Sequence, residues 1–125
     1  MFRPVRHAIL VLSLMTVPAM AFTARNAVEV QGSAERIEVQ PTAGQAAPES
    51  WCAAGDFVIR GLGLPGTTLV YRLTPPPRRS GEGVTFSLSP EGATDRTGLL
   101  QIGTYGNAVT AAHAQALCRT GGKRF

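Results

Sequence analysis

Histidine and cysteine are scarce in this chain of 125 residues, which contains two of each. His7 lies in the N-terminal leader described below, so His113 is the one histidine beyond it. A structural zinc site takes about four Cys or His ligands at characteristic spacings, which Cys52, Cys118 and His113 do not supply. The wide separation of the cysteines also excludes a CxxC redox motif and a CxxCH haem site. We therefore expect no metal site and no cofactor.

A strong charge of either sign is missing as well. The chain has 12 Lys and Arg against 8 Asp and Glu, a formal net charge of +4, and loss of Arg3 and Arg6 with the leader lowers it by two. Proteins that bind nucleic acid usually carry a dense Lys/Arg face. Nucleic acid is therefore not an expected partner.

The motifs of common hydrolases and nucleotide enzymes are absent: the sequence has no GxSxG elbow, no HExxH helix and no Walker loop. Residues 61–66 do match GxGxxG. That dinucleotide fingerprint needs a strand before it and a helix after it, so that helix amides meet the pyrophosphate. Here a helix is predicted before the match, and Pro65, Thr67 and Thr68 lead into a predicted strand. We interpret the match as a helix end followed by a turn.

What the chain does have is a hydrophobic leader. A basic start is followed by an apolar run over residues 9–20, and residues 19–21 read Ala-Met-Ala. This pattern is typical of a secretory signal peptide cleaved after Ala21. The run is short for a membrane span, which needs about 20 apolar residues. We expect a signal peptide over residues 1–21, no stable membrane insertion after its removal, and a periplasmic or extracellular protein over residues 22–125.

The two cysteines then acquire a structural interpretation. In an oxidising compartment an even pair of cysteines predicts a disulfide, here between Cys52 and Cys118. Closing so long a loop restricts the unfolded chain by roughly 4 kcal/mol in the loop-entropy treatment.

The first half of the predicted domain contains a hairpin and a helix. Alternating apolar residues predict two strands within residues 26–40, joined by a turn at residues 32–35, with a flexible tail as the alternative. Residues 41–47 form a connector. A helix is predicted over residues 48–60, with Pro48 and Glu49 in its first turn and Gly61 as its left-handed end. Trp51 lies at core spacing on this helix.

The second half is predicted as strands followed by a helix. Leu69, Tyr71 and Leu73 alternate with Val70, Arg72 and Thr74, and residues 84–88 repeat the pattern more clearly. Three prolines at 75–77 keep the link between these strands from being a tight turn. Residues 99–102 are a candidate minor strand. A final helix is predicted over residues 108–119, capped by Asn107, with His113 on its apolar face and a flexible tail after it.

These elements predict an α+β domain: a small antiparallel sheet of about four strands, with two helices on one face joined by the disulfide. Residues 51–57, Trp-Cys-Ala-Ala-Gly-Asp-Phe, resemble a motif of a group of small exported bacterial proteins of unassigned function. The matches at residues 22–26, 84–88 and 107–118 extend the resemblance over nearly all of the mature chain. It implies export and one disulfide, and it carries no catalytic or binding residue.

Our leading hypothesis for function is a non-catalytic exported module that binds an envelope protein or polymer, or forms part of the envelope. Arg78 and Arg79 follow the three prolines and are the candidate binding residues, because arginine pairs with carboxylates and phosphates. One alternative is a small secreted hydrolase using Asp56 and His113, which requires these side chains to converge. Another is an inhibitor that inserts the rigid proline loop into the cleft of a secreted enzyme.

Overall fold

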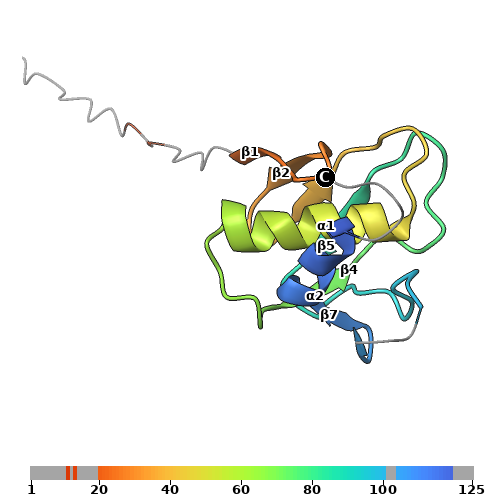
Figure 1. Cartoon of the computed structure of the whole chain (residues 1–125). Helices are drawn as coiled ribbons and strands as arrows, with labels where there is room; N and C mark the ends of the chain where they lie inside the picture. The colour runs from red at the N-terminus through yellow and green to blue at the C-terminus, as the bar shows by residue number, and fades with distance from the viewer. Residues whose placement is uncertain (1–10, 12, 14–19, 101–103, 120–125) are drawn as a thin grey trace, which may run out of the picture.

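The chain folds into an α+β domain in a computed structural model that describes residues 11, 13, 20–100 and 104–119 (Figure 1). Its described strands form one antiparallel sheet of seven, in the order β1-β2-β3-β5-β4-β7-β6. The strands are β1 (Met20–Thr23), β2 (Glu29–Gly32), β3 (Ile37–Val39), β4 (Leu69–Arg72), β5 (Val84–Ser87), β6 (Thr104–Tyr105) and β7 (Ala108–Thr110). The helices are α1 (Ala47–Asp56), continued by a π-helical turn η1 (Phe57–Gly61), and α2 (Ala111–Ala116), continued by a 3-10 turn η2 (Leu117–Arg119).

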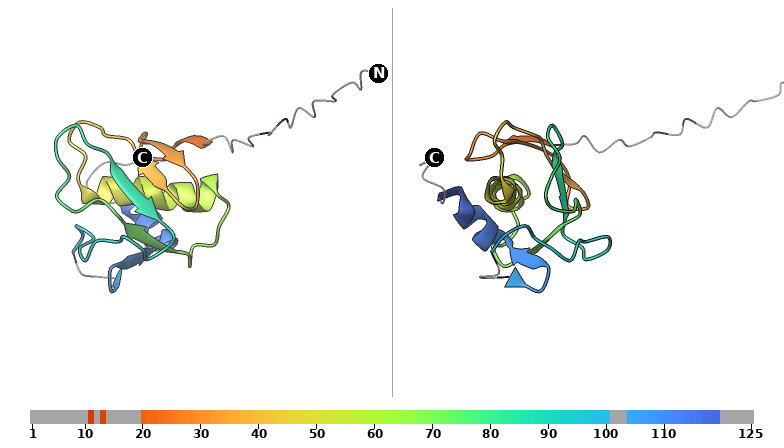
Figure 2. Two further views of the ribbon diagram at one scale, coloured as in Figure 1. Left: turned by 180° about the vertical axis from the view of Figure 1, so that it is seen from behind. Right: turned by 90° about the vertical axis from the view of Figure 1, so that its right-hand side faces the viewer.

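The sheet curls around α1, which is seen end-on in the right-hand view of Figure 2. Every α1 residue from Ser50 to Asp56 is buried, and so are Phe57 and Val58 of η1. A helix buried on all sides is normally apolar all round, and the run from Trp51 to Ala54 meets that condition. Trp51 packs edge-on against Phe86 of β5, with ring centroids 4.7 Å apart. The core therefore lies between α1 and the concave face of the sheet.

The second helix lies over α1 rather than over the sheet. Gly55 makes this close approach possible, because a Cβ there would lie 2.6 Å from the backbone N of Gln115 and 2.7 Å from Cβ of Ala114. The predicted disulfide is present between Cys52 of α1 and Cys118 of η2, with the two Cα atoms 4.9 Å apart. The predicted bridge between the two helices is confirmed, whereas α2 packs mainly on α1 instead of on the face of the sheet.

The N-terminal hairpin is confirmed and extended. β2 pairs with β3, and the turn between them is closed by a 2.9 Å hydrogen bond from the Ser33 amide to the Arg36 carbonyl. β1 adds a further strand, pairing Phe22 with Val30. This strand covers both sides of the expected cleavage point, since Ala21 pairs with Gln31. Cleavage after Ala21 would remove two residues of β1 and leave Phe22 and Thr23 paired with Val30 and Glu29.

The last predicted helix is wrong at its start. Residues 108–110 form strand β7, which pairs with β4 through Val70 and Val109. Helix α2 begins at Ala111, and its cap is the Thr110 hydroxyl, which accepts a 3.2 Å hydrogen bond from the His113 amide, in place of the predicted Asn107. The β-branched pair Val109 and Thr110 favours a strand. Strands β6 and β7 pair with each other, and together with β1 they raise the number of strands above the expected four.

Two smaller expectations also change. Leu99 and Leu100 are not in a strand, and residues 101–102 of the candidate minor strand lie outside the described residues, as does the tail from 120 onward. Gly61 ends η1 without a left-handed conformation; Gly63, with φ +69°, adopts it instead. Gly61 is needed for space, since a Cβ there would lie 2.8 Å from the Phe57 ring.

None of the helices in the described part of the chain is both long enough and apolar enough to cross a bilayer.

Candidate anion-binding site

A pocket of about 550 Å³ opens beside the N-terminus of α1. Its walls come from four segments far apart in the sequence: the connector and first residues of α1, the end of β4, the proline loop, and the loop before residue 100. The residues that line it are Gln45, Ala46, Ala47, Ser50, Arg72, Pro76, Pro77, Arg78, Arg96, Thr97, Gly98 and Leu99. Three of these residues are arginines, and none is acidic.

Arg72 is the central feature of the pocket because it occupies a core-facing position. Strand alternation places it on the same side of β4 as Val70, and it pairs with Phe86 across the sheet. The residue is only 2% exposed. The more apolar row of this strand, which begins at Leu69, faces outward, and Leu69 is 37% exposed. The sequence pattern therefore predicts the strand but not the face that its arginine occupies.

The guanidinium of Arg72 is hydrogen-bonded but has no counter-ion among the described residues. Its Nε donates to the Thr74 carbonyl at 2.7 Å, and its Nη1 donates to the Thr97 carbonyl at 3.3 Å. Its Nη2 donates to none of the described residues. Burial disfavours the charged form and lowers the pKa of Arg72 from its ordinary value. A buried cation without a carboxylate is unfavourable for folding, which makes it a marker of function.

The other two arginines differ from each other. Arg96 is exposed, and its guanidinium makes no hydrogen bond or ion pair within residues 20–100 and 104–119, so its donors are available at the pocket. Arg78 is already used as a clamp. It donates to the carbonyls of Gln45 at 3.1 Å, Thr42 at 3.0 Å and Glu82 at 3.1 Å. Arg78 thereby holds the proline loop against the connector.

The first turn of α1 forms one wall of the pocket. Its N-cap is Ala46, which has no side chain able to accept from the helix amides. Glu49 instead accepts a 3.1 Å hydrogen bond from the Ala46 amide. Nearby, Gln45 donates to the Ser50 hydroxyl at 2.7 Å. The Glu49 carboxylate therefore offsets the partial positive charge of this helix end, and the positive charge of the pocket comes from its arginines.

The pocket therefore combines three cationic side chains with hydrogen-bond donors and no carboxylate. Guanidinium groups match the planar geometry of carboxylates and bind phosphates through two parallel hydrogen bonds. Buried or partly buried donors hold such an anion more strongly than donors in water do. The arrangement is suited to binding an oxyanion. The residues that line the pocket do not include a nucleophile next to a base that could act on such an anion.

Of the two predicted binding residues, one lies at this site. Arg78 lines the pocket, although as a clamp. Arg79 is exposed and is not among the lining residues; its amide donates to Glu82 at 3.2 Å. Sequence reasoning missed Arg72 and Arg96. The sequence offered one signal: Arg72 lies two residues after Val70 on a predicted strand, so both side chains face the same side of the sheet. Which side faces the core depends on how the sheet packs.

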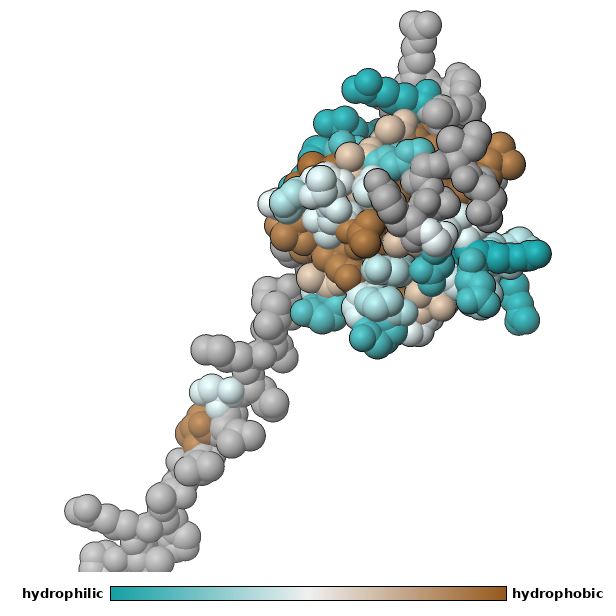
Figure 3. Space-filling view, turned by 90° about the horizontal axis from the view of Figure 1, so that it is seen from below, coloured by the Kyte–Doolittle hydropathy of each residue, from teal (hydrophilic) through white to brown (hydrophobic). Residues whose placement is uncertain are grey.

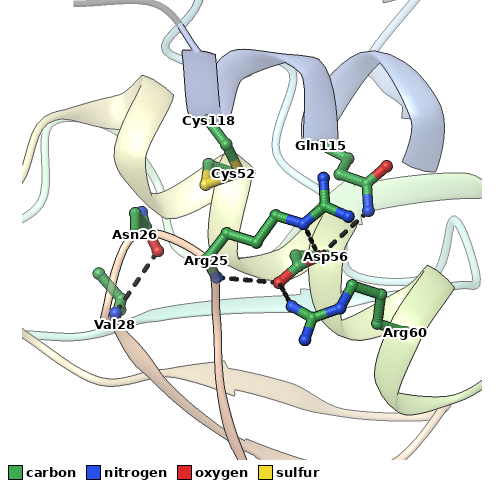
Figure 4. A network of polar contacts seen from close by, with 8 residues as sticks. All are labelled: Arg25, Asn26, Val28, Cys52, Asp56, Arg60, Gln115 and Cys118. Atoms are coloured by element: carbon green, nitrogen blue, oxygen red, sulfur yellow. Dashed lines mark hydrogen bonds and ion pairs between the residues drawn. A yellow bond between two sulfur atoms is a disulfide. The ribbon is translucent and has the colours of Figure 1, made fainter. Parts of the chain in front are cut away.

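Asp56 and His113, the residues of the hydrolase hypothesis, are not brought together. The buried carboxylate of Asp56 is surrounded by other donors (Figure 4): the Arg25 amide at 2.9 Å, Arg60 Nη1 at 2.7 Å and the Gln115 amide nitrogen at 3.1 Å. The His113 ring is not one of these partners. On α2, Gln115 reaches Asp56, and His113 lies two positions before it, where a helix points the side chain in nearly the opposite direction.

Asp56 instead connects three parts of the fold. Arg25 lies in the loop after β1, Arg60 in η1 and Gln115 in α2, and Arg60 also lies 5.4 Å from the centre of the Phe22 ring. This network fixes the N-terminal strand to both helices. Its role is structural.

No group of three or more His, Cys, Asp and Glu side chains within the described residues could hold a metal ion. Figure 3 shows, on the face seen from below, small hydrophobic patches interspersed with hydrophilic residues. Comparison of the chain with protein-family models, with curated proteins and with solved structures finds no match.

Proposed function

We propose that this protein is a non-catalytic binding module, exported to the cell envelope, whose pocket at Arg72 binds the carboxylate or phosphate group of its ligand. The observation that carries the proposal is the guanidinium of Arg72, 2% exposed and without a counter-ion among the described residues. A bound anion would provide that counter-ion. Arg96 would supply a second set of donors from the rim of the pocket.

The geometry favours binding over catalysis. The pocket lining contains one hydroxyl from Ser50 and one from Thr97, and both are engaged: Ser50 accepts from Gln45, and Thr97 accepts from the Leu99 amide at 3.1 Å. The lining has no histidine or carboxylate to act as a base. The pocket thus has residues that can hold an oxyanion, and its lining has no residue that would activate a nucleophile.

Export remains part of this proposal. It is supported by the leader pattern and by the Cys52–Cys118 disulfide, because disulfides persist mainly in oxidising compartments. An envelope offers many carboxylates and phosphates, on polymers and in small molecules, as partners for an arginine pocket. The proposal moves the binding residues from Arg78 and Arg79 to Arg72 and Arg96.

The test is a calorimetric titration of the disulfide-bonded protein with inorganic phosphate and with acetate. We expect saturable binding that weakens as salt is raised, since exposed charge interactions are screened. Arg96→Gln should lower the affinity about tenfold, in line with a charged hydrogen bond of roughly 1.5–3 kcal/mol. Arg72→Gln should abolish binding, with circular dichroism confirming that the variant is folded.

Arg79→Gln is the matched control. It removes the same charge from an exposed residue that does not line the pocket, so the affinity should stay within about twofold, as expected for a distant surface charge. Equal loss from Arg79→Gln and Arg96→Gln would show a diffuse electrostatic effect and contradict the proposal. Absence of any saturable binding of either anion would also contradict it.

A further inference from the structure

The volume of the pocket is larger than that of a single phosphate or carboxylate group. Its volume of about 550 Å³ lies in the range of small-molecule sites, roughly 300–1,000 Å³. A phosphate or carboxylate at Arg72 and Arg96 occupies only the part of that space within hydrogen-bond distance of the guanidinium groups. The remaining volume must be filled by the rest of the ligand or by water.

Beside the polar Gln45, Ser50, Arg78 and Thr97, the rest of the lining includes five apolar residues. Pro76 and Pro77 come from the proline loop, Leu99 from the loop before residue 100, and Ala46 and Ala47 from the start of α1. None of these side chains offers a hydrogen bond. Water is bound well only where it finds several polar partners, and an apolar group gains free energy by displacing it elsewhere. This part of the pocket is therefore suited to an apolar group.

Gly98 connects the cationic part and the apolar part. Its φ of +80° is a left-handed conformation that glycine adopts without strain. A Cβ there would lie 3.0 Å from Nη1 of Arg72, 3.1 Å from Cβ of Ala47 and 3.3 Å from Cβ of Pro76. Arg72 and the apolar lining thus meet around one residue without a side chain. One ligand can contact both.

We propose, building on the oxyanion-binding function above, that the ligand is a soluble amphiphile: a phosphate or carboxylate group held by Arg72 and Arg96, joined to an apolar chain or ring that contacts Pro76, Pro77 and Leu99. The burial of Arg72 favours a soluble molecule over a headgroup in a membrane. A headgroup in a bilayer surface reaches exposed arginines more readily than one that is 2% exposed.

The experiment compares three probes by calorimetry on the disulfide-bonded protein: hexyl phosphate, inorganic phosphate and 1-hexanol. We expect hexyl phosphate to bind at least about tenfold more tightly than inorganic phosphate, since burial of two CH₂ groups alone supplies that factor at about 0.8 kcal/mol each. We expect 1-hexanol to bind more weakly than hexyl phosphate, because it lacks the anion. Equal affinity for the two phosphates would overturn this inference while leaving oxyanion binding intact; binding by neither would overturn the proposed function itself.

Substitutions locate the apolar contact. Leu99→Ser should reduce the preference for hexyl phosphate over inorganic phosphate, and Leu99→Met should restore it. Leu100→Ser is the matched control, because Leu100 is 86% exposed and does not line the pocket. A loss of preference in Leu100→Ser equal to that in Leu99→Ser would contradict the proposed placement.

A final arm separates a soluble amphiphile from a membrane surface. The protein is sedimented with phosphatidylcholine vesicles that contain phosphatidic acid. We expect no co-sedimentation above that with phosphatidylcholine alone. Co-sedimentation that is lost in Arg72→Gln would identify the membrane headgroup as the source of the phosphate and overturn the soluble ligand.

Discussion

At the scale of single residues, two charged side chains are buried in the described fold, and their surroundings are opposite. Asp56 is fully buried and paired with two arginines, whereas Arg72 is 2% exposed and has only carbonyl acceptors. A buried charge that is paired within the fold contributes to structure, and one that is not is a candidate for binding. Sequence alone could not separate them, because both follow apolar neighbours.

The Asp56 network predicts a large effect on stability. Asp56→Ala removes the acceptor of the Arg25 amide, of Arg60 and of Gln115. We expect the free energy of unfolding to fall by about 2–4 kcal/mol, because several donors lose their partner at once. Chemical denaturation measures this. Glu38→Gln is the comparison: its pair with Arg36 is exposed at both ends and should contribute at most about 1 kcal/mol.

The turn between β2 and β3 gives a prediction on pH. The Ser33 hydroxyl donates to Glu35 at 2.8 Å, and this bond, followed by one from the Glu35 amide, lowers the pKa of Glu35 from its ordinary value. A carboxyl pKa that is lower in the folded state stabilises the fold above the unfolded pKa, and that contribution is lost as the pH falls through the folded pKa.

NMR titration of the Glu35 carboxyl tests this prediction. Ser33→Ala should raise the pKa of Glu35 toward the unfolded value. A Glu35 pKa that does not respond to Ser33→Ala would refute the stated cause.

At the scale of elements, the sequence predicts the positions of helices and strands better than it predicts which of the two forms where a strand and a helix meet. The helix predicted over residues 48–60 covers nearly all of α1 and η1, because Pro48 and Glu49 mark its start and small apolar residues continue it. At Val109 the spacing of apolar residues predicts a helix, whereas the β-branched residues favour a strand. Pairing with Val70 of β4 decides in favour of the strand. A contact between distant segments cannot be read from a local pattern.

The contact between α1 and α2 predicts the effect of a small substitution. Gly55→Ala gains about 1 kcal/mol of helix propensity, but its Cβ meets the backbone N of Gln115 at 2.6 Å and the Ala111 carbonyl at 2.8 Å. Backbone atoms cannot move aside as a flexible side chain can. We therefore expect a net destabilisation of about 1–3 kcal/mol by thermal or chemical unfolding.

Ala116→Ser provides the control for this substitution. Ala116 is an exposed residue of α2, so its substitution should change stability by no more than about 0.5 kcal/mol. A stabilised Gly55→Ala variant would show that the two helices are not in close contact.

At the scale of the whole molecule, the α+β class, the antiparallel sheet and the bridge between the helices follow from the sequence, and the pocket does not. The two cysteines predict their own pairing because the chain offers no other. The pocket is assembled from four segments, and only the proline loop among them was singled out for binding. Its central arginine is placed there by the pairing of Arg72 with Phe86 across the sheet.

The disulfide predicts a measurable contribution to global stability. Replacing Cys52 and Cys118 together by alanine should lower the free energy of unfolding by about 2–5 kcal/mol, mainly through the greater freedom of the unfolded chain. Denaturation of the wild type with and without reductant should show the same difference. Titration of two free thiols in the native protein would contradict the bridge.

The burial of α1 on all sides has a consequence for the order of events during synthesis. The strands that surround it come from both sides in the sequence, β1 to β3 before it and β4 to β7 after it, and α2 covers it last. A chain that is synthesised from its N-terminus therefore cannot complete this core until its final segments have been made. Contacts between distant segments slow folding, because the loops between them must close first. We therefore expect this chain to fold only after its synthesis is nearly complete.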